Sequence, residues 1–348
     1  MTRAGISCVL TALLLLASVS ARADAVAAHL NVAIPDFGTG VASTSTYAEL
    51  GIFPRVRTIE AQFLPYALRR RLAASGDWGV VRVVADDAPV EELVIHGDIL
   101  RSDGRELAIR VRAIDASGLA WLDETFTAAT SATAAAGAEP AYESLFAEVA
   151  GRLGEALAGQ SAEHLENVRD LALMRYGLRL APKAFDQYVA EMPDGRFELS
   201  RLPARSDPML DRITRIREAE YVIIDAADEK YATLHEDVVS VYDVWRKYSR
   251  KSLEYEAQDE RRIADSTPPG PRGSYDALLH SYENYKFSRM TAEERDDMAV
   301  AFDNEVRPIV ERLDERLTAY DAWLEGKYAE WNRLLEELNV LETRFSPQ

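Results

Sequence analysis

The sequence predicts an α+β protein in which a small mixed-sheet α/β domain is followed by an all-α domain with a long antiparallel coiled-coil hairpin. Three observations lead to this prediction. Short runs with period-two alternation dominate the chain up to about residue 128, and apolar residues recur at helical spacing after it. Two of the helical runs are long and similar in length. A single proline-rich break at 266–271 joins them, which favours an antiparallel arrangement.

The first domain is predicted to contain five strands and two helices. The strands are expected at 30–37, 78–84, 94–101, 107–114 and 119–126, and the helices at 56–75 and from Pro140 onward. In the fourth strand Leu107, Ile109 and Val111 should face the core, because alternate side chains lie on opposite faces of a strand. Gly76 follows the first helix where a left-handed C-terminal cap is expected.

The rest of the chain is predicted to be helical, beginning with helices at 161–180 and 182–192. Asp207 as N-cap and Pro208 as the first helical residue then start a long helix that ends near Asp265. Thr291 with Glu294 forms a capping box for the last helix. Each long helix has roughly 55 residues and would extend about 80 Å.

The first long helix carries a stripe with the spacing of a coiled-coil seam. It comprises Ala227, Tyr231, Leu234, Val238, Val241, Trp245, Tyr248, Ser252 and Tyr255. Neither helix could bury its stripe alone, so the two should pair. A second stripe would then be left for a partner protein or for another protomer, which makes a homo-oligomer through the helical domain possible.

The amino terminus has the pattern of a secretory signal peptide. Arg3 precedes an apolar run at 9–17, and Ala21-Arg22-Ala23 provides a cleavage site before Asp24. The run is shorter than the roughly 20 residues of a membrane anchor. The expected organisation is therefore a signal peptide at 1–23, an α/β domain at 24–158, a helical connector at 159–206 and the hairpin domain at 207–348. The mature protein is expected in the periplasm without a direct membrane span.

Composition narrows the expected partners. The chain has 58 Asp and Glu against 40 Lys and Arg, which gives a formal net charge of −18. Binding to nucleic acid or to anionic lipid needs basic surface, so neither is expected. The one cysteine, Cys8, lies within the predicted signal peptide. The mature protein is therefore expected to have no disulfides.

The first domain resembles a known family in three stretches: VAIPDF at 32–37, LRRRLAASGDW at 68–78, and VIHGDILRSDGRELAIRVRAIDASGLAWLDETF at 94–126. Together with their spacing, they resemble the amino-terminal domain of TolB over residues 30–157, and the curli secretion lipoprotein CsgG carries a related unit. This resemblance implies a module for protein–protein interaction in the cell envelope. The chain departs from TolB after residue 160, where no β-propeller repeats follow. It lacks the lipidated cysteine and membrane-crossing hairpins of CsgG.

No set of residues with catalytic or metal-binding spacing is found. Asp36-Phe37-Gly38 copies a kinase motif but lacks the other kinase motifs that give it meaning. The five histidines, at 29, 96, 164, 235 and 280, are scattered, whereas a zinc site needs at least three converging ligands. The acidic residues at 293–297 begin a helix, where they would offset its dipole. We therefore expect no catalytic residues, no metal and no cofactor.

Aromatic residues gather in the helical half, and Tyr and Trp are frequent at protein interfaces. Most would fill the seam of the hairpin. Tyr242, Trp323 and Tyr328 lie off the best seam positions, so they are the candidate interaction residues.

The sequence favours a non-enzymatic periplasmic interaction or scaffold protein of the cell envelope, with an envelope protein as its partner. An extracytoplasmic module that binds a small ligand or glycan is the main alternative, and a hydrolase with distant paired carboxylates is a third.

Overall fold

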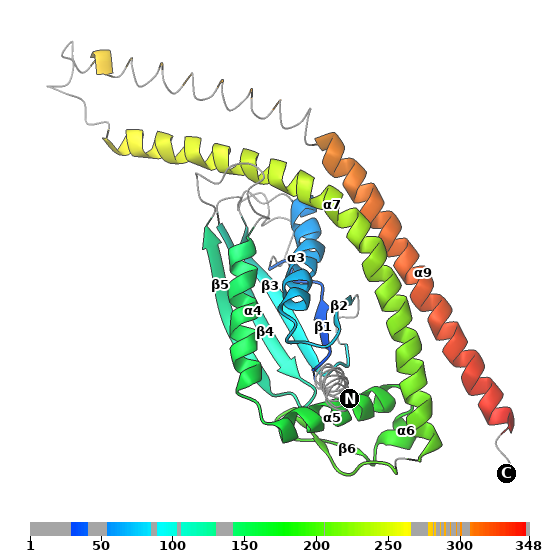
Figure 1. Cartoon of the computed structure of the whole chain (residues 1–348). Helices are drawn as coiled ribbons and strands as arrows, with labels where there is room; N and C mark the ends of the chain where they lie inside the picture. The colour runs from blue at the N-terminus through cyan, green and yellow to red at the C-terminus, as the bar shows by residue number, and fades with distance from the viewer. Residues whose placement is uncertain are drawn as a thin grey trace, which may run out of the picture.

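A computed structural model describes residues 29–40, 54–84, 89–102, 106–129, 142–204, 206–265 and 307–345, with separate positions between 278 and 300. These residues form a five-stranded sheet, helices packed on it, and a long pair of helices (Figure 1). The predicted mixed α and β class is confirmed. The predicted signal peptide lies outside the described residues.

The sheet consists of β1 (Val32–Pro35), β2 (Val81–Val84), β3 (Leu93–Ser102), β4 (Glu106–Asp115) and β5 (Ala120–Ala129). Their order is β2-β1-β3-β4-β5. β1 is parallel to both β2 and β3, whereas β3, β4 and β5 are antiparallel to one another. All five predicted strands are therefore present, although β1 and β2 are shorter than expected.

The turn between β4 and β5 is fixed by a side chain. Oδ1 of Asp115 accepts hydrogen bonds from the backbone N–H groups of Ser117 (2.8 Å) and Leu119 (3.1 Å). Gly118 adopts a positive φ of 84° in this turn, which a residue without a Cβ reaches at no steric cost. The Asp-Ala-Ser-Gly sequence therefore makes the tight connection that its residue types favour.

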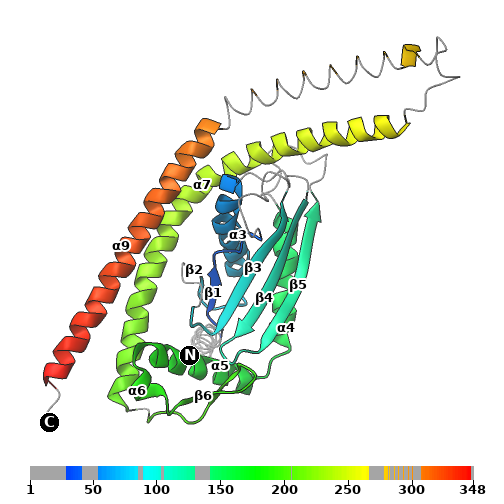
Figure 2. The ribbon, with the colours of Figure 1, turned by 180° about the vertical axis from the view of Figure 1, so that it is seen from behind.

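The main core lies between the sheet and two helices, α3 (Pro54–Ser75) and α4 (Glu143–Ala158), which cover one face (Figure 2). Leu107, Ile109 and Val111 of β4 point into this core and are each 0% exposed, as the alternation predicted. Gly76 ends α3 with a φ of 75°, which confirms the predicted cap. The opposite face of β4 carries two arginines, Arg110, which is exposed, and Arg112, which is half-buried.

After the α/β unit come α5 (Ala162–Leu180) and the short α6 (Pro182–Phe185). The helix predicted at 182–192 is wrong beyond Phe185. The chain instead forms a small hairpin of β6 (Val189–Glu191) and β7 (Phe197–Leu199). Its turn contains Gly195 at a φ of 81°, and Asp194 pairs with Arg196 across it. Turn chemistry at Pro193-Asp194-Gly195 therefore favours a hairpin over a longer helix here.

Two long helices complete the fold, α7 (Pro208–Asp265) and α9 (Arg307–Phe345). The backbone N–H of Met209 donates to Oδ1 of Asp207 (2.8 Å), so Asp207 caps α7 as predicted. α7 has 58 residues and so extends about 87 Å. Both views show α9 running antiparallel beside the middle and amino-terminal part of α7 (Figures 1 and 2).

The predicted seam of α7 packs partly on the α/β unit. Tyr231 and Val238 belong to the main core, and Ile224 packs on Ala33 and Val84 of the sheet. Most side chains from Leu234 to Tyr255 lie outside the described residues, so coiled-coil packing in the distal half stays a prediction. Within the described ranges, none of the helices combines the length and the apolarity needed to cross a membrane.

Candidate functional site

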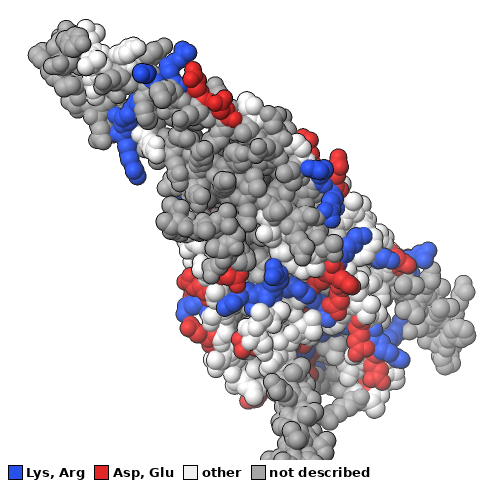
Figure 3. All heavy atoms as spheres, turned by 45° about the horizontal axis from the view of Figure 1, so that its top comes forward, with Lys and Arg blue, Asp and Glu red and all other residues white. Residues whose placement is uncertain are grey.

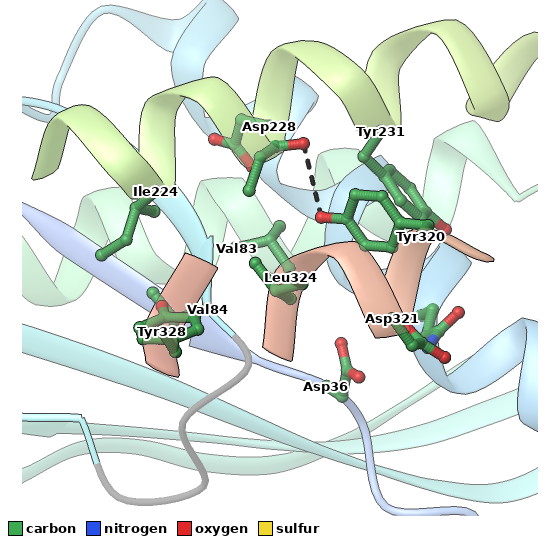
Figure 4. Close-up of a pocket in the computed structure, with 12 residues that line it drawn as sticks. Asp36, Val83, Val84, Ile224, Asp228, Tyr231, Tyr320, Asp321, Leu324 and Tyr328 are labelled. Atoms are coloured by element: carbon green, nitrogen blue, oxygen red, sulfur yellow. Dashed lines mark hydrogen bonds between the residues drawn. The ribbon is translucent and has the colours of Figure 1, made fainter. Parts of the chain in front are cut away.

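Titratable and aromatic side chains gather where α7 and α9 meet β2 and α3 (Figure 4). They surround a cavity of about 50 Å³, which we call the junction cavity. Three carboxylic acids line it, each from a different part of the chain: Asp36 after β1, Asp228 on α7 and Asp321 on α9. The phenols of Tyr231, Tyr320 and Tyr328 line it as well.

Direct contacts hold the three helices together around this cavity. The hydroxyl of Tyr320 donates to the backbone oxygen of Ala227 (3.3 Å), drawn as the dashed line in Figure 4. The rings of Tyr231 and Tyr320 meet edge to face with centroids 5.5 Å apart. Gln62 on α3 donates to Oδ1 of Asp321 (3.4 Å). Tyr66 on α3 contacts Tyr231 at 5.0 Å, so α3, α7 and α9 share one aromatic cluster.

Burial controls protonation in the junction cavity. Asp228 is 7% exposed, and desolvation raises its pKa to about 6 although Nε of Arg69 lies 3.1 Å from its carboxylate. Burial also raises the pKa of Asp321. It raises the pKa of Tyr231 well above its ordinary value, so this phenol stays protonated at neutral pH. These groups suit packing and hydrogen bonding better than nucleophilic chemistry.

Metal binding is not supported where side chains can be placed. No group of three or more His, Cys, Asp or Glu in the described part of the chain could hold an ion.

The Asp36-Phe37-Gly38 motif has a structural explanation. Phe37 packs so closely on Gly97 that a Cβ there would lie 2.5 Å from the ring. The N–H of Gly38 donates to the oxygen of Gly97 (2.8 Å), which ties this segment to β3.

A second cluster, closer to the start of α7, is ionic. Arg217 on α7 pairs with Glu91, and both are buried. The hydroxyl of Tyr221 donates to the other oxygen of Glu91 (2.7 Å). Arg82 on β2 stacks over the Tyr221 ring at 3.9 Å and pairs with Asp225 at 2.7 Å. We call these five residues the ionic cluster. All of them except Asp225 border a cavity of about 30 Å³.

Glu92 lies beside the ionic cluster, and its environment favours the protonated form. Burial raises its pKa to about 7, and the neighbouring charge of Glu91 acts in the same direction. The backbone N–H of Asn31 donates to its Oε2 (2.6 Å), which partly offsets that effect. Glu92 therefore keeps its proton to a higher pH than an ordinary glutamic acid does.

The three predicted interaction residues have different positions. Tyr328 lines both cavities. Trp323 is half-buried, with Nζ of Lys230 4.3 Å from its ring centroid and Tyr320 stacked at 6.2 Å. The side chain of Tyr242 lies outside the described residues. Two of the three therefore lie where α7 meets α9, and contact with another protein stays a prediction for all three.

Sequence reasoning missed the ionic cluster entirely. Arg217 and Tyr221 are four residues apart and so share a face of α7. That spacing is the one local signal available. Their acceptor, Glu91, is 126 residues away from Arg217 and lies on a loop before β3, which no pattern in the sequence connects to α7.

Comparisons with known proteins do not identify a family for this chain. No protein family matches this chain, and no curated protein matches it. Among solved structures, it is similar to the dodecamer of a PelC variant from Paraburkholderia phytofirmans. The TM-score is 0.24 and the identity 17%, over 36% of this chain and 89% of that chain. A similarity at this level carries no argument about the fold or function of this protein.

Proposed function

We propose that this protein is a non-enzymatic interaction or scaffold protein of the cell envelope that works in the periplasm after export. The observation that carries the proposal is a set of exposed apolar side chains between α7 and α9. Leu278, Tyr282 and Val300 are 63%, 62% and 59% exposed. Leu278 and Tyr282 are both in helical backbone and four residues apart, so they lie on the same side of it, and apolar side chains exposed together are typical of protein-binding surfaces. We call these three residues the distal apolar set.

The architecture supports this proposal. The first half of α7 is anchored on the α/β unit by buried side chains, which reach as far as Val238 among the side chains that the structure describes. Beyond that anchor α7 continues to Asp265 and passes the end of the sheet (Figures 1 and 2). A rigid helix that is anchored at one end can hold a contact surface away from the domain that carries it.

Export and the class of partner are supported by sequence. The amino-terminal pattern supports secretion, since Arg3 is followed by an apolar run and then by the small residues of a cleavage site. The resemblance of residues 30–157 to the TolB amino-terminal domain supports an envelope protein as partner. The net charge of −18 disfavours nucleic acid. Basic and acidic side chains are interspersed on the described part of the face in Figure 3, which fits local ion pairing.

In-cell photocrosslinking tests the proposal. A photoreactive residue replaces Tyr282 in the full chain, and a matched protein carries it at Leu100, which is exposed on β3. We expect one dominant envelope protein to be crosslinked from position 282 and not from position 100. The double substitution Leu278→Asp and Val300→Asp should abolish that product. Equal products from both positions, or none from 282, would refute the proposal.

Localisation is tested separately. Osmotic release of the periplasm, with amino-terminal sequencing of the released protein, should give a chain that begins at Asp24. A protein that stays in the cytoplasm with Arg3 intact would contradict the export part of the proposal.

A further inference from the structure

A cavity of about 220 Å³ lies away from the junction, between α3, α4 and α7. It is larger than the junction cavity and the cavity beside the ionic cluster. The rings of Phe63 and Phe146 form an apolar floor, and both are buried. The remaining lining residues are Ala67, Arg70, Arg71, Ala74, Glu143, His235 and Val239. The cavity is therefore apolar inside and charged at its rim.

The two rim arginines differ in their partners. Nη1 of Arg71 lies 3.6 Å from the carboxylate of Glu143, so this charge is compensated. Arg70 has no carboxylate partner among the described residues. Its one contact there is with Nε2 of His235, at 3.2 Å. An arginine at the rim of an apolar cavity, without an acid beside it, is suited to bind an anion.

The contact with Arg70 also fixes the state of His235. A guanidinium has only donors, so Nε2 accepts and the ring proton is on Nδ1. Burial lowers the pKa of His235 to about 4, and Arg70 acts in the same direction, so the ring is neutral at physiological pH. The ring stacks on Phe63 with centroids 5.1 Å apart. Nδ1 is buried without a hydrogen-bond partner in the described part of the chain, which leaves one donor unsatisfied.

We propose that this cavity binds a small organic anion with an apolar body, such as an aromatic or branched aliphatic monocarboxylate. Its body would pack on Phe63, Phe146 and Val239, and its carboxylate would pair with Arg70 at the rim. A cavity of about 150 Å³ is enough to bind benzene, so 220 Å³ holds a ring with a short acidic arm. This site is separate from the distal apolar set and does not depend on the proposed scaffold role.

Calorimetric titration of the full-length protein tests the site. Phenylacetate is the probe, and phenylacetamide is its neutral analogue of nearly equal shape. We expect phenylacetate to bind about tenfold more tightly or better, because a hydrogen bond to a charged group contributes more than a neutral one. Equal affinity for the two probes would overturn the anionic part of the proposal. No binding of phenylacetate at millimolar concentration would overturn all of it.

Three variants locate the binding. Arg70→Gln should lower phenylacetate affinity at least tenfold and leave phenylacetamide affinity unchanged. Ala67→Phe should remove binding of both probes by filling the cavity. Arg110→Gln, which changes an exposed arginine paired with Asp123 on the open sheet face, is the matched control and should bind as wild type. Thermal melts confirm that each variant is folded. Wild-type affinity in folded Arg70→Gln or Ala67→Phe would place the ligand elsewhere and overturn the assignment.

Discussion

The long helix α7 is attached to the α/β unit by two clusters of opposite chemistry. Near its start, Arg217 and Tyr221 meet the buried carboxylate of Glu91. About four turns later, Tyr231 and His235 meet the rings of Phe63 and Tyr66. Both clusters are buried, but only the second is stabilised mainly by apolar area. A buried ion pair loses much of its attraction to the cost of removing both charges from water.

The difference suggests a division of roles along one helix. The aromatic cluster contributes most of the stabilisation, since each aromatic ring buries a large apolar area. The ionic cluster contributes little net stability, but it tolerates only one register of α7, because a shifted helix would leave Glu91 or Arg217 buried without a partner. Four predictions, in order of decreasing effect, test this comparison.

The largest effect is expected in the aromatic cluster. Tyr231→Ala should lower the free energy of unfolding by about 4 kcal/mol, because it leaves a cavity between Tyr66 and Tyr320. Tyr231→Phe is the matched control and should cost less than about 1 kcal/mol, since the Tyr231 hydroxyl has no hydrogen-bond partner in the described part of the chain. Urea denaturation measures both. A larger loss for the Phe variant than for Ala would show that the hydroxyl, rather than the ring, stabilises this contact.

The ionic cluster should respond differently to single and paired changes. Arg217→Met leaves the Glu91 carboxylate buried without a cationic partner, and should cost about 3 kcal/mol. Combining it with Glu91→Leu should restore most of that loss, because neither charge then has to be desolvated. A double-mutant cycle measures the coupling. If the double variant is as unstable as the single one, the ion pair is a net source of stability. The claim that the ionic cluster contributes little net stability would then be wrong.

The raised pKa of Glu92 predicts that the free energy of unfolding depends on pH. Its pKa is about 7 in the folded protein and near 4.5 when unfolded, so the folded state retains the proton longer. The resulting stabilisation is fully present below about pH 4.5 and is lost as the pH rises through 7. Between pH 5 and 7 the free energy of unfolding should fall by about 2 kcal/mol on this account. Glu92→Gln, whose side-chain oxygen can still accept from Asn31, should remove that part of the slope. An unchanged slope in the variant would assign the titration to another group.

Local patterns predicted most of the fold. The alternation of Leu107, Ile109 and Val111, the cap at Gly76 and the N-cap at Asp207 each depend on neighbours in sequence, and each is confirmed. The cavities depend instead on distant contacts. Tyr231 was expected to face another helix in a coiled-coil seam, but it also packs on α3, and the spacing of residues along α7 carries no information on that second neighbour. The helix expected at 182–192 ends at Phe185, and a hairpin follows because Asp194 and Gly195 favour a tight turn.

The smallest effect is expected at the outer edge of the ionic cluster. Arg82 pairs with Asp225 at 2.7 Å, but Asp225 is 52% exposed, so water screens much of this attraction. Asp225→Asn should therefore cost less than about 1 kcal/mol, because Arg82 keeps its stacking on Tyr221 and the amide oxygen can still accept from it. Chemical denaturation at low and high salt measures the effect, which should shrink as salt is added. A loss as large as that of Arg217→Met would mean that the ionic cluster acts as one unit, and the contrast between its buried and exposed pairs would no longer hold.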